Sequence, residues 1–159
     1  MQFEGMMSFA LDIQKFAQHC IDNADLVVRK TVLDVGKSLV ERTPVGNPEL
    51  WQNPDNKPDG YVGGHARANW SHSIGALNQQ EFDEIDDKDW NGHNISRSRI
   101  EAALDEIPKM AGKVHYIQNS LPYMQALEDG HSTQAPAGIV AVTEVEFHDY
   151  VEKAIGELT

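Results

Sequence analysis

The chain has 159 residues, of which 40% are hydrophobic and 24% are charged, and its formal net charge is −12. These values are typical of one soluble globular domain, and no run of about 18 apolar residues predicts a membrane span. The 25 Asp and Glu residues outnumber 13 Lys and Arg without any visible basic cluster. This balance disfavours direct binding to nucleic-acid phosphates.

The cysteine count and the N-terminal residues indicate the cellular compartment in which the protein is expected to fold. Cys20 is the single cysteine, which excludes an internal disulfide and fits assembly in a reducing cytoplasm. The first residues, MQFEGMMSFALDIQ, contain neither a basic leader nor a long apolar stretch. We therefore expect no secretory signal.

Two helices are predicted in the first quarter of the chain. Residues 8–20 have Ser8 as a possible N-cap, a turn is expected around Asp22–Asn23, and residues 24–42 follow as a longer helix. The apolar stripe of the first helix consists of Phe9, Ile13, Phe16 and Cys20. The second helix is apolar on two sides, which predicts either a central core helix or a seam shared with a neighbouring subunit.

Regular structure is not expected between Thr43 and Gly64, where prolines and glycines are frequent. Long loops without structure of their own are usually functional or disordered. Trp51 and Tyr61 argue against disorder because aromatic side chains bring large apolar area. They pack either on their own domain or against another subunit.

Residues 65–74 alternate between two faces, which predicts a half-buried strand. In a strand His65 and His72 point to opposite faces and cannot share a metal ion. We predict no metal site and no cofactor.

The next segment is acidic. Residues 81–89 hold six acids, and Asp87–Gly92 matches the first half of an EF-hand calcium loop. The twelfth position of that loop, which needs a bidentate Glu, is Ser98. A plain Asx-Gly turn is the preferred interpretation, and a calcium-dependent binding protein is kept as an alternative.

Two more helices are predicted. One spans residues 97–107, capped by Asn94 or Ser96 and limited by Pro108. The other begins at a capping box formed by Thr143 and Glu146. Its expected apolar face consists of Phe147, Tyr150, Val151, Ala154, Ile155 and Leu158.

The stretch from Gly112 to Val142 is predicted to organise the chain as strand, short helix, tight stop, loop and strand. Residues 113–118 form the first strand, and Ser120 can cap the helix that follows. Gly130 supplies the left-handed residue that ends this helix. Pro136 and Gly138 lie in the loop 132–138 and are expected to shape it.

Two sequence blocks resemble a family of tailed-phage proteins. The later block reads NSLPY at 119–123, LEDGHS at 127–132 and QAPAG at 134–138. The earlier block contains TPVG at 43–46, LW at 50–51 and GYVGG at 60–64, followed by Arg67, Asn69 and Trp70. In this order they resemble the neck, or tail-completion, proteins that join head to tail, also called gp-ten-like morphogenesis proteins.

The resemblance implies a fold and an assembly. Such proteins are compact α+β domains that form rings, commonly sixfold, around the channel through which DNA leaves. We expect one α+β domain over residues 1–159, with a small, mostly antiparallel sheet, a long N-terminal helix and a C-terminal helix. The residues expected at interfaces are Trp51, Tyr61, Gly63, Gly64, Arg67, Trp70, Tyr123, Glu128, Gly130, Gln134 and Pro136.

The function predicted is structural. The sequence contains no nucleophile elbow, P-loop, dinucleotide fingerprint or zinc-protease motif, so we do not expect an enzyme. We expect a virion protein, assembled in the host cytoplasm as a homo-hexameric ring, that contacts other neck, connector and tail-tube proteins. A tail terminator and a head-side stopper are alternatives at the same junction.

Overall fold

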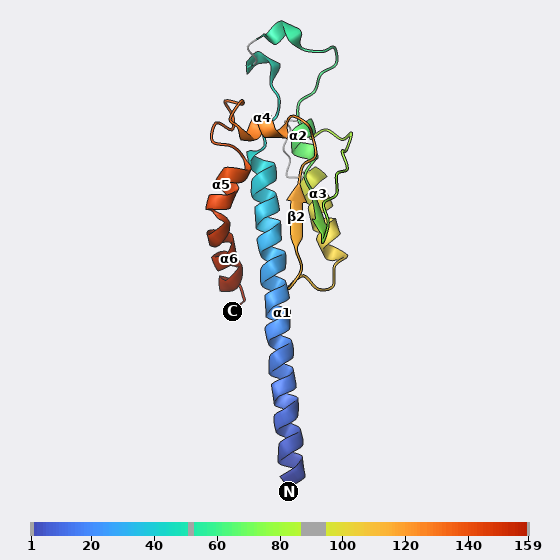
Figure 1. Ribbon diagram of the computed structural model, residues 1–159, viewed down its shortest axis with the longest axis vertical. Helices are drawn as coiled ribbons and strands as arrows, with labels where there is room; N and C mark the ends of the chain where they lie inside the picture. Colours follow the sequence, from blue (N-terminus) through green and yellow to red (C-terminus); the bar gives the residue numbers. More distant parts are fainter. Residues whose placement is uncertain (1, 51–52, 87–94, 159) are drawn as a thin grey trace.

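The computed structural model describes residues 2–50, 53–86 and 95–158 and shows an α+β arrangement, as predicted. One helix, α1 (Gln2–Arg42), forms the long axis, and the other elements pack around its C-terminal half (Figure 1). The N-terminal half of α1 projects beyond this body, and residues 8–22 are all exposed. No helix among the described residues is long and apolar enough to cross a membrane.

The turn predicted at Asp22–Asn23 is wrong, because α1 is a single helix of 41 residues. The polar side chains there pair with side chains one helical turn earlier. Gln18 Nε2 donates to Asp22 Oδ1 at 2.8 Å, and Asn23 Nδ2 lies 3.4 Å from His19 Nε2. Such i, i+4 pairs stabilise a solvent-exposed helix and outweigh the turn preference of the two residues.

The body contains short elements on both sides of α1. In chain order they are η1 (Pro48–Leu50), η2 (Pro54–Asn56), α2 (His65–Ala68), β1 (Ser71–Ile74), α3 (Ile95–Asp105), β2 (His115–Gln118), α4 (Met124–Glu128), α5 (Val140–Val145) and α6 (Phe147–Gly156). In Figure 1, α5 and α6 lie on one side of α1, with β2 and α3 on the other. Strands β1 and β2 form a two-stranded antiparallel sheet in which Ser71 is opposite Gln118.

The strand predicted over residues 65–74 is confirmed only in its second half. Gly64, at φ +109°, precedes α2, and the chain becomes extended only from Ser71. Asn69 stabilises this change of direction: its side-chain amide donates to His65 O at 2.8 Å and to Phe82 O at 2.9 Å. The alternation of residues 65–74 therefore suggested a strand where residues 65–68 form a helical turn. That turn depends on a hydrogen bond to Phe82, which is distant in sequence.

The strand predicted at the end of the organising stretch is also wrong, since residues 140–145 form α5. The capping box predicted at Thr143 and Glu146 does not form. Thr143 Oγ1 donates to Ile139 O at 2.9 Å inside α5, and the Glu146 carboxylate accepts from Arg42 at 2.6 and 2.7 Å. The predicted cap at Ser120 is absent as well, because Tyr123 occupies the N-cap position of α4.

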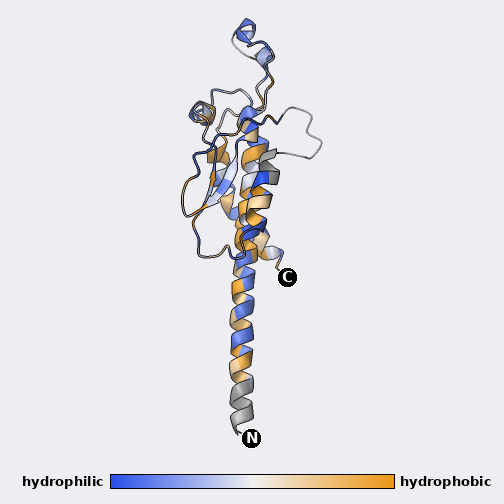
Figure 2. Cartoon of the chain, turned by 90° about the vertical axis from the view of Figure 1, so that its right-hand side faces the viewer, coloured by the Kyte–Doolittle hydropathy of each residue, from blue (hydrophilic) through white to orange (hydrophobic). Residues whose placement is uncertain are grey.

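The core lies between the C-terminal half of α1, α3 and the start of α5. It consists of Val32, Leu39, Val40, Trp70, Ile100, Leu104, Met110, Ala135 and Ile139. Val32, Leu39 and Val40 agree with the central-core interpretation of the second half of α1, whereas Leu26 is 46% exposed, and the seam with a neighbouring subunit stays a prediction. The apolar face predicted for the last helix is only partly covered, since Ala154 is buried whereas Phe147 and Ile155 are about half exposed. Figure 2 shows that apolar residues also continue along α1 outside the body.

Candidate interaction surface

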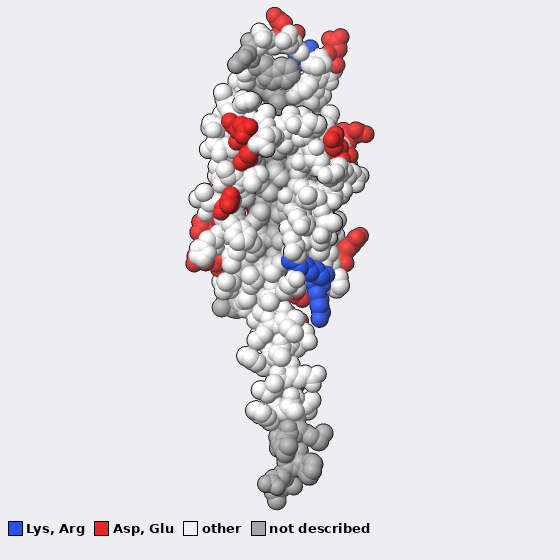
Figure 3. Space-filling view, viewed as in Figure 1, with Lys and Arg blue, Asp and Glu red and all other residues white. Residues whose placement is uncertain are grey.

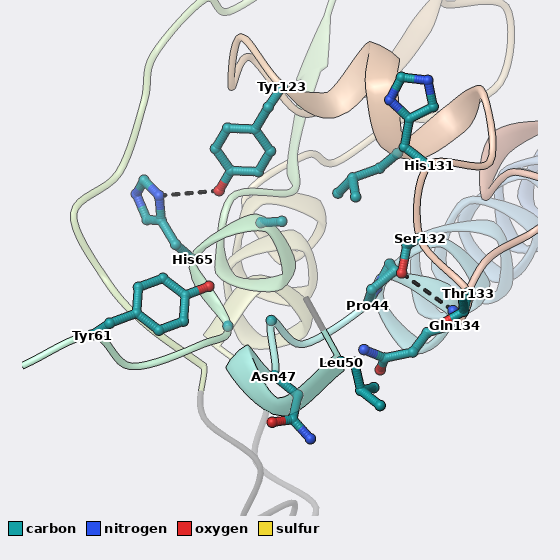
Figure 4. A pocket seen from close by; sticks show the side chains of 14 residues that line it. Pro44, Asn47, Leu50, Tyr61, His65, Tyr123, His131, Ser132, Thr133 and Gln134 are labelled. Atoms are coloured by element: carbon teal, nitrogen blue, oxygen red, sulfur yellow. Dashed lines mark hydrogen bonds between the residues drawn. The ribbon is translucent and has the colours of Figure 1, made fainter. Parts of the chain in front are cut away.

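A pocket of about 970 Å³ lies beside the C-terminal end of α1 (Figure 4). Its lining comes from residues 44–50, from residues 61–66 around the start of α2, and from residues 123–134, which contain α4. These are parts of the two sequence blocks that carry the resemblance. The fold therefore brings the two blocks together on one surface.

Hydrogen bonds tie the blocks to each other. Gln134 Nε2 donates to Val45 O at 3.1 Å, and Tyr123 Oη lies 3.3 Å from His65 Nδ1. His65 Nε2 lies 2.8 Å from the carbonyl of Phe82, which can only accept. His65 Nε2 therefore carries the proton, and Nδ1 accepts from the Tyr123 hydroxyl.

The phenol of Tyr123 is neutral in this contact. Burial, followed by the proximity of Tyr61 and Glu81, raises the pKa of Tyr123 above its ordinary value. The Tyr123 side chain lies at the pocket rim and remains exposed in part. A neutral tyrosine with an apolar ring and a polar tip is suited to contact a protein surface.

Two glycines of the earlier block allow its segments to approach closely. A Cβ atom on Gly63 would lie 2.2 Å from Gly46 O, and a Cβ atom on Gly64 would lie 1.8 Å from Asp86 O. Neither position can hold a side chain without displacing backbone. These glycines hold the chain in place beside the pocket.

Four of the predicted interface residues line the pocket: Tyr61, Gly64, Tyr123 and Gln134. Trp51 lies outside the described residues. The remaining six make contacts within the chain and do not line the pocket. They are Gly63, Arg67, Trp70, Glu128, Gly130 and Pro136.

Trp70 and Arg67 are internal. Trp70 is 3% exposed, and its indole Nε1 donates to Thr43 Oγ1 at 2.7 Å. Arg67 Nε lies 3.8 Å from the buried carboxylate of Asp86. Both side chains are little exposed and are used within the chain, so they are not available to a partner.

Glu128, Gly130 and Pro136 form the turn that connects α4 to α5. The Glu128 carboxylate accepts backbone N–H groups of Ile139, Val140 and Ala141, each at 2.8 Å. Burial raises the pKa of Glu128, but the three N–H donors lower it more, so that the net pKa is below its ordinary value. A side chain of α4 therefore caps the N-terminus of α5.

The predicted left-handed stop at Gly130 is confirmed, with φ +78°. A Cβ atom there would lie 2.7 Å from Pro136 O, so the glycine also permits the loop to fold back. Gly130 and the Glu128 cap thus together fix the loop between α4 and α5.

Sequence reasoning missed a histidine pair in the sheet. His72 Nε2 lies 3.0 Å from His115 Nδ1, and His115 Nε2 lies 3.0 Å from Met110 O. Burial and then the neighbouring His115 lower the pKa of His72 to about 4. The two histidines lie on diagonal positions of paired strands, which only the register could reveal.

Within residues 2–50, 53–86 and 95–158, no group of three His, Cys, Asp or Glu side chains could hold a metal ion. The half-motif at Asp87–Gly92 lies outside these residues, so the calcium alternative stays a prediction without a test.

Comparison of the chain with protein-family models, curated proteins and solved structures finds no match.

Proposed function

We propose that this protein is a structural component of a tailed-phage virion that joins the DNA-filled head to the tail. The proposal starts from the resemblance of the two sequence blocks to neck and tail-completion proteins. One observation carries it further: the blocks, which lie far apart in the sequence, line one pocket and are hydrogen-bonded to each other. A shared surface is what two motifs with a common role would require.

The chemistry of this surface suits contact with another protein. Leu50 is 58% exposed at the pocket, and the rings of Tyr61 and Tyr123 also line it. Aromatic and apolar side chains contribute most of the binding energy in protein interfaces. The pocket is held by a braced scaffold of glycines and buried hydrogen bonds, so little conformational entropy is lost on docking.

The proposed mechanism is assembly without covalent chemistry. The subunits form a ring, proposed to be a hexamer, and the pocket end of each subunit contacts a connector or tail-tube protein. A closed ring requires a heterologous contact between neighbouring subunits. The net charge of −12 would keep exiting DNA from adhering to such a ring.

The test is deletion of the gene in a phage that encodes the protein, followed by electron microscopy of the lysate. We expect DNA-filled heads and complete tails that remain separate. Purified wild-type protein added to the lysate should restore joining. Normal joined virions from the deletion phage would exclude the joining function, and empty heads would instead indicate a role in DNA retention.

A matched pair of variants tests the pocket itself. Leu50→Asp places a charge on the proposed contact surface, whereas Leu77→Asp changes an equally exposed leucine (61%) that does not line the pocket. Both proteins should fold, because neither side chain is buried. Only Leu50→Asp should fail to restore joining. Equal activity of the two variants would show that the pocket is not the contact surface.

A further inference from the structure

A second hollow, different from the pocket, runs along α1. This groove has a volume of about 580 Å³; α1 forms its floor, β2 one wall, and α5 and α6 the other. Its lining is mainly aliphatic and aromatic, with Val27, Val35, Leu39, Ile117 and Phe147 among its residues. In Figure 3 the middle of the face shown is largely uncharged, with acidic groups along both edges and Lys and Arg side chains at the lower right of the body.

The projecting half of α1 carries a solvent-exposed apolar stripe. Phe9, Ile13 and Phe16 are each more than half exposed, and Cys20 is exposed on the same side. We call residues 8–24 the arm. Contiguous exposed apolar residues of this size usually mark an interaction site.

The stripe and the groove lie on one face of the same helix. Positions 9, 13, 16 and 20 follow the 4-3 spacing of a coiled-coil seam, and Val27, one heptad after Cys20, is the first α1 residue in the groove lining. At 1.5 Å per residue, the stripe from Phe9 to Cys20 is about 17 Å long. The α1 residues that line the groove, from Val27 to Leu39, span about 18 Å by the same measure, and Val32 and Leu39 among them are buried.

Charge favours the same pairing. Two copies of a chain with net charge −12 repel each other, and the repulsion is smallest where the contacting surfaces are uncharged. The stripe contains no ionisable carboxylate, and Glu144 is the one acid among the described residues that line the groove. An acidic partner would find no complementary charge among these residues, and a basic partner would find only Glu144.

We infer that the arm of a second copy of this chain occupies the groove. The arm supplies an apolar helix, and the groove supplies an apolar bed of matching length, so each copy offers both halves of one contact. The contact either closes reciprocally between two copies or passes from copy to copy around a ring. It deepens the proposed assembly by naming the surfaces that join the subunits, and its test needs only the purified chain.

The first experiment measures the mass of the full-length protein by size-exclusion chromatography with light scattering over a range of concentrations. We expect a dimer or a larger closed species. Phe16→Glu on the stripe and Phe147→Glu in the groove should each weaken association about tenfold or more, because each places a carboxylate in an apolar contact. A protein that remains monomeric at every concentration would overturn the inference.

Both substitutions have controls on the same element or beside it. Leu11→Glu changes an exposed arm residue off the stripe (54%, against 67% for Phe16), and Val145→Glu changes an exposed residue outside the groove lining (83%, against 51% for Phe147). The controls should associate like wild type. If Leu11→Glu is as damaging as Phe16→Glu, the contact does not use the stripe.

A mixing experiment identifies the occupant. Phe16→Glu leaves the groove intact, and Phe147→Glu leaves the arm intact, so the two variants should bind each other in a one-to-one complex more tightly than either binds itself. No complex on mixing would show that the arm does not enter the groove. Native mass spectrometry that detects an apolar small molecule bound to the monomer would likewise overturn the inference. The function in head–tail joining could still hold after either result.

Discussion

Glu128 Oε2 accepts a hydrogen bond from the backbone N–H of Val140 at 2.8 Å, and through this contact α4 determines where α5 begins. The N–H groups at a helix start have no partner within the helix, and here one carboxylate satisfies three of them. The same contact places Ile139 in the core, where it is fully buried.

We predict that Glu128→Ala destabilises the fold by about 1–3 kcal/mol, because partly buried N–H donors lose a charged acceptor. Glu128→Gln should cost less, since one acceptor oxygen remains. Chemical denaturation monitored by circular dichroism measures both. Asp129→Asn, on the exposed neighbour, is the control and should unfold like wild type. Equal stability of all four proteins would contradict the cap.

A second prediction separates backbone strain from steric contact at Gly130. Gly112 has nearly the same φ (+76° against +78°), but a Cβ atom there would meet nothing within 4 Å. Both Gly→Ala substitutions therefore incur the left-handed penalty of about 1–2 kcal/mol. Only Gly130→Ala adds a clash with Pro136 O, so its thermal midpoint should be the lower of the two. Identical midpoints would mean that the loop can move away.

A third prediction concerns the buried hydroxyl beneath the pocket. Thr43 Oγ1 accepts from the Trp70 indole at 2.7 Å and donates to Leu39 O at 2.6 Å. Thr43→Val keeps the shape of the side chain but removes both interactions, so it should cost about 1–3 kcal/mol. Thr43→Ser retains the hydroxyl and should recover most of that loss. If serine is no better than valine, the hydrogen bonds contribute little.

The fourth prediction is a pH dependence. The pKa of His72 is about 4 in the folded protein, against an ordinary value of 6.5. Between these values the unfolded chain binds a proton that the native protein does not, so stability falls as pH decreases through this window. Thermal melts at pH about 7 and about 5 should show a smaller difference for His72→Asn than for wild type. Equal differences for wild type and His72→Asn would contradict this assignment.

Local signals in the sequence predicted part of the fold correctly. The helix around residues 97–107 was expected from its apolar spacing, and it forms as α3 over Ile95–Asp105. Gly130 was expected to end a short helix, and its φ confirms this. These features depend on residues close to each other in the chain, which is why the sequence alone could indicate them.

Features that depend on distant residues were mistaken or missed. Residues 139–142 have the composition of a strand, but Glu128 caps them as the start of a helix. Trp70 was placed at an interface because it belongs to a motif, yet Thr43, 27 positions earlier, holds its indole in the core. The histidine pair required knowledge of the strand register. In each case the deciding partner is remote in sequence.

The unequal surroundings of α1 have a consequence for its amide hydrogen exchange. The helix is continuous from Gln2 to Arg42, but tertiary contacts cover only its second half, beginning near Asp25, whose carboxylate accepts the N–H groups of Met110 and Ala111. An isolated helical segment as short as the arm is marginally stable in water. In protein that does not self-associate, such as the Phe16→Glu variant, deuterium should therefore enter residues 8–22 rapidly and residues 28–42 slowly, with the boundary inside one unbroken helix rather than at its end.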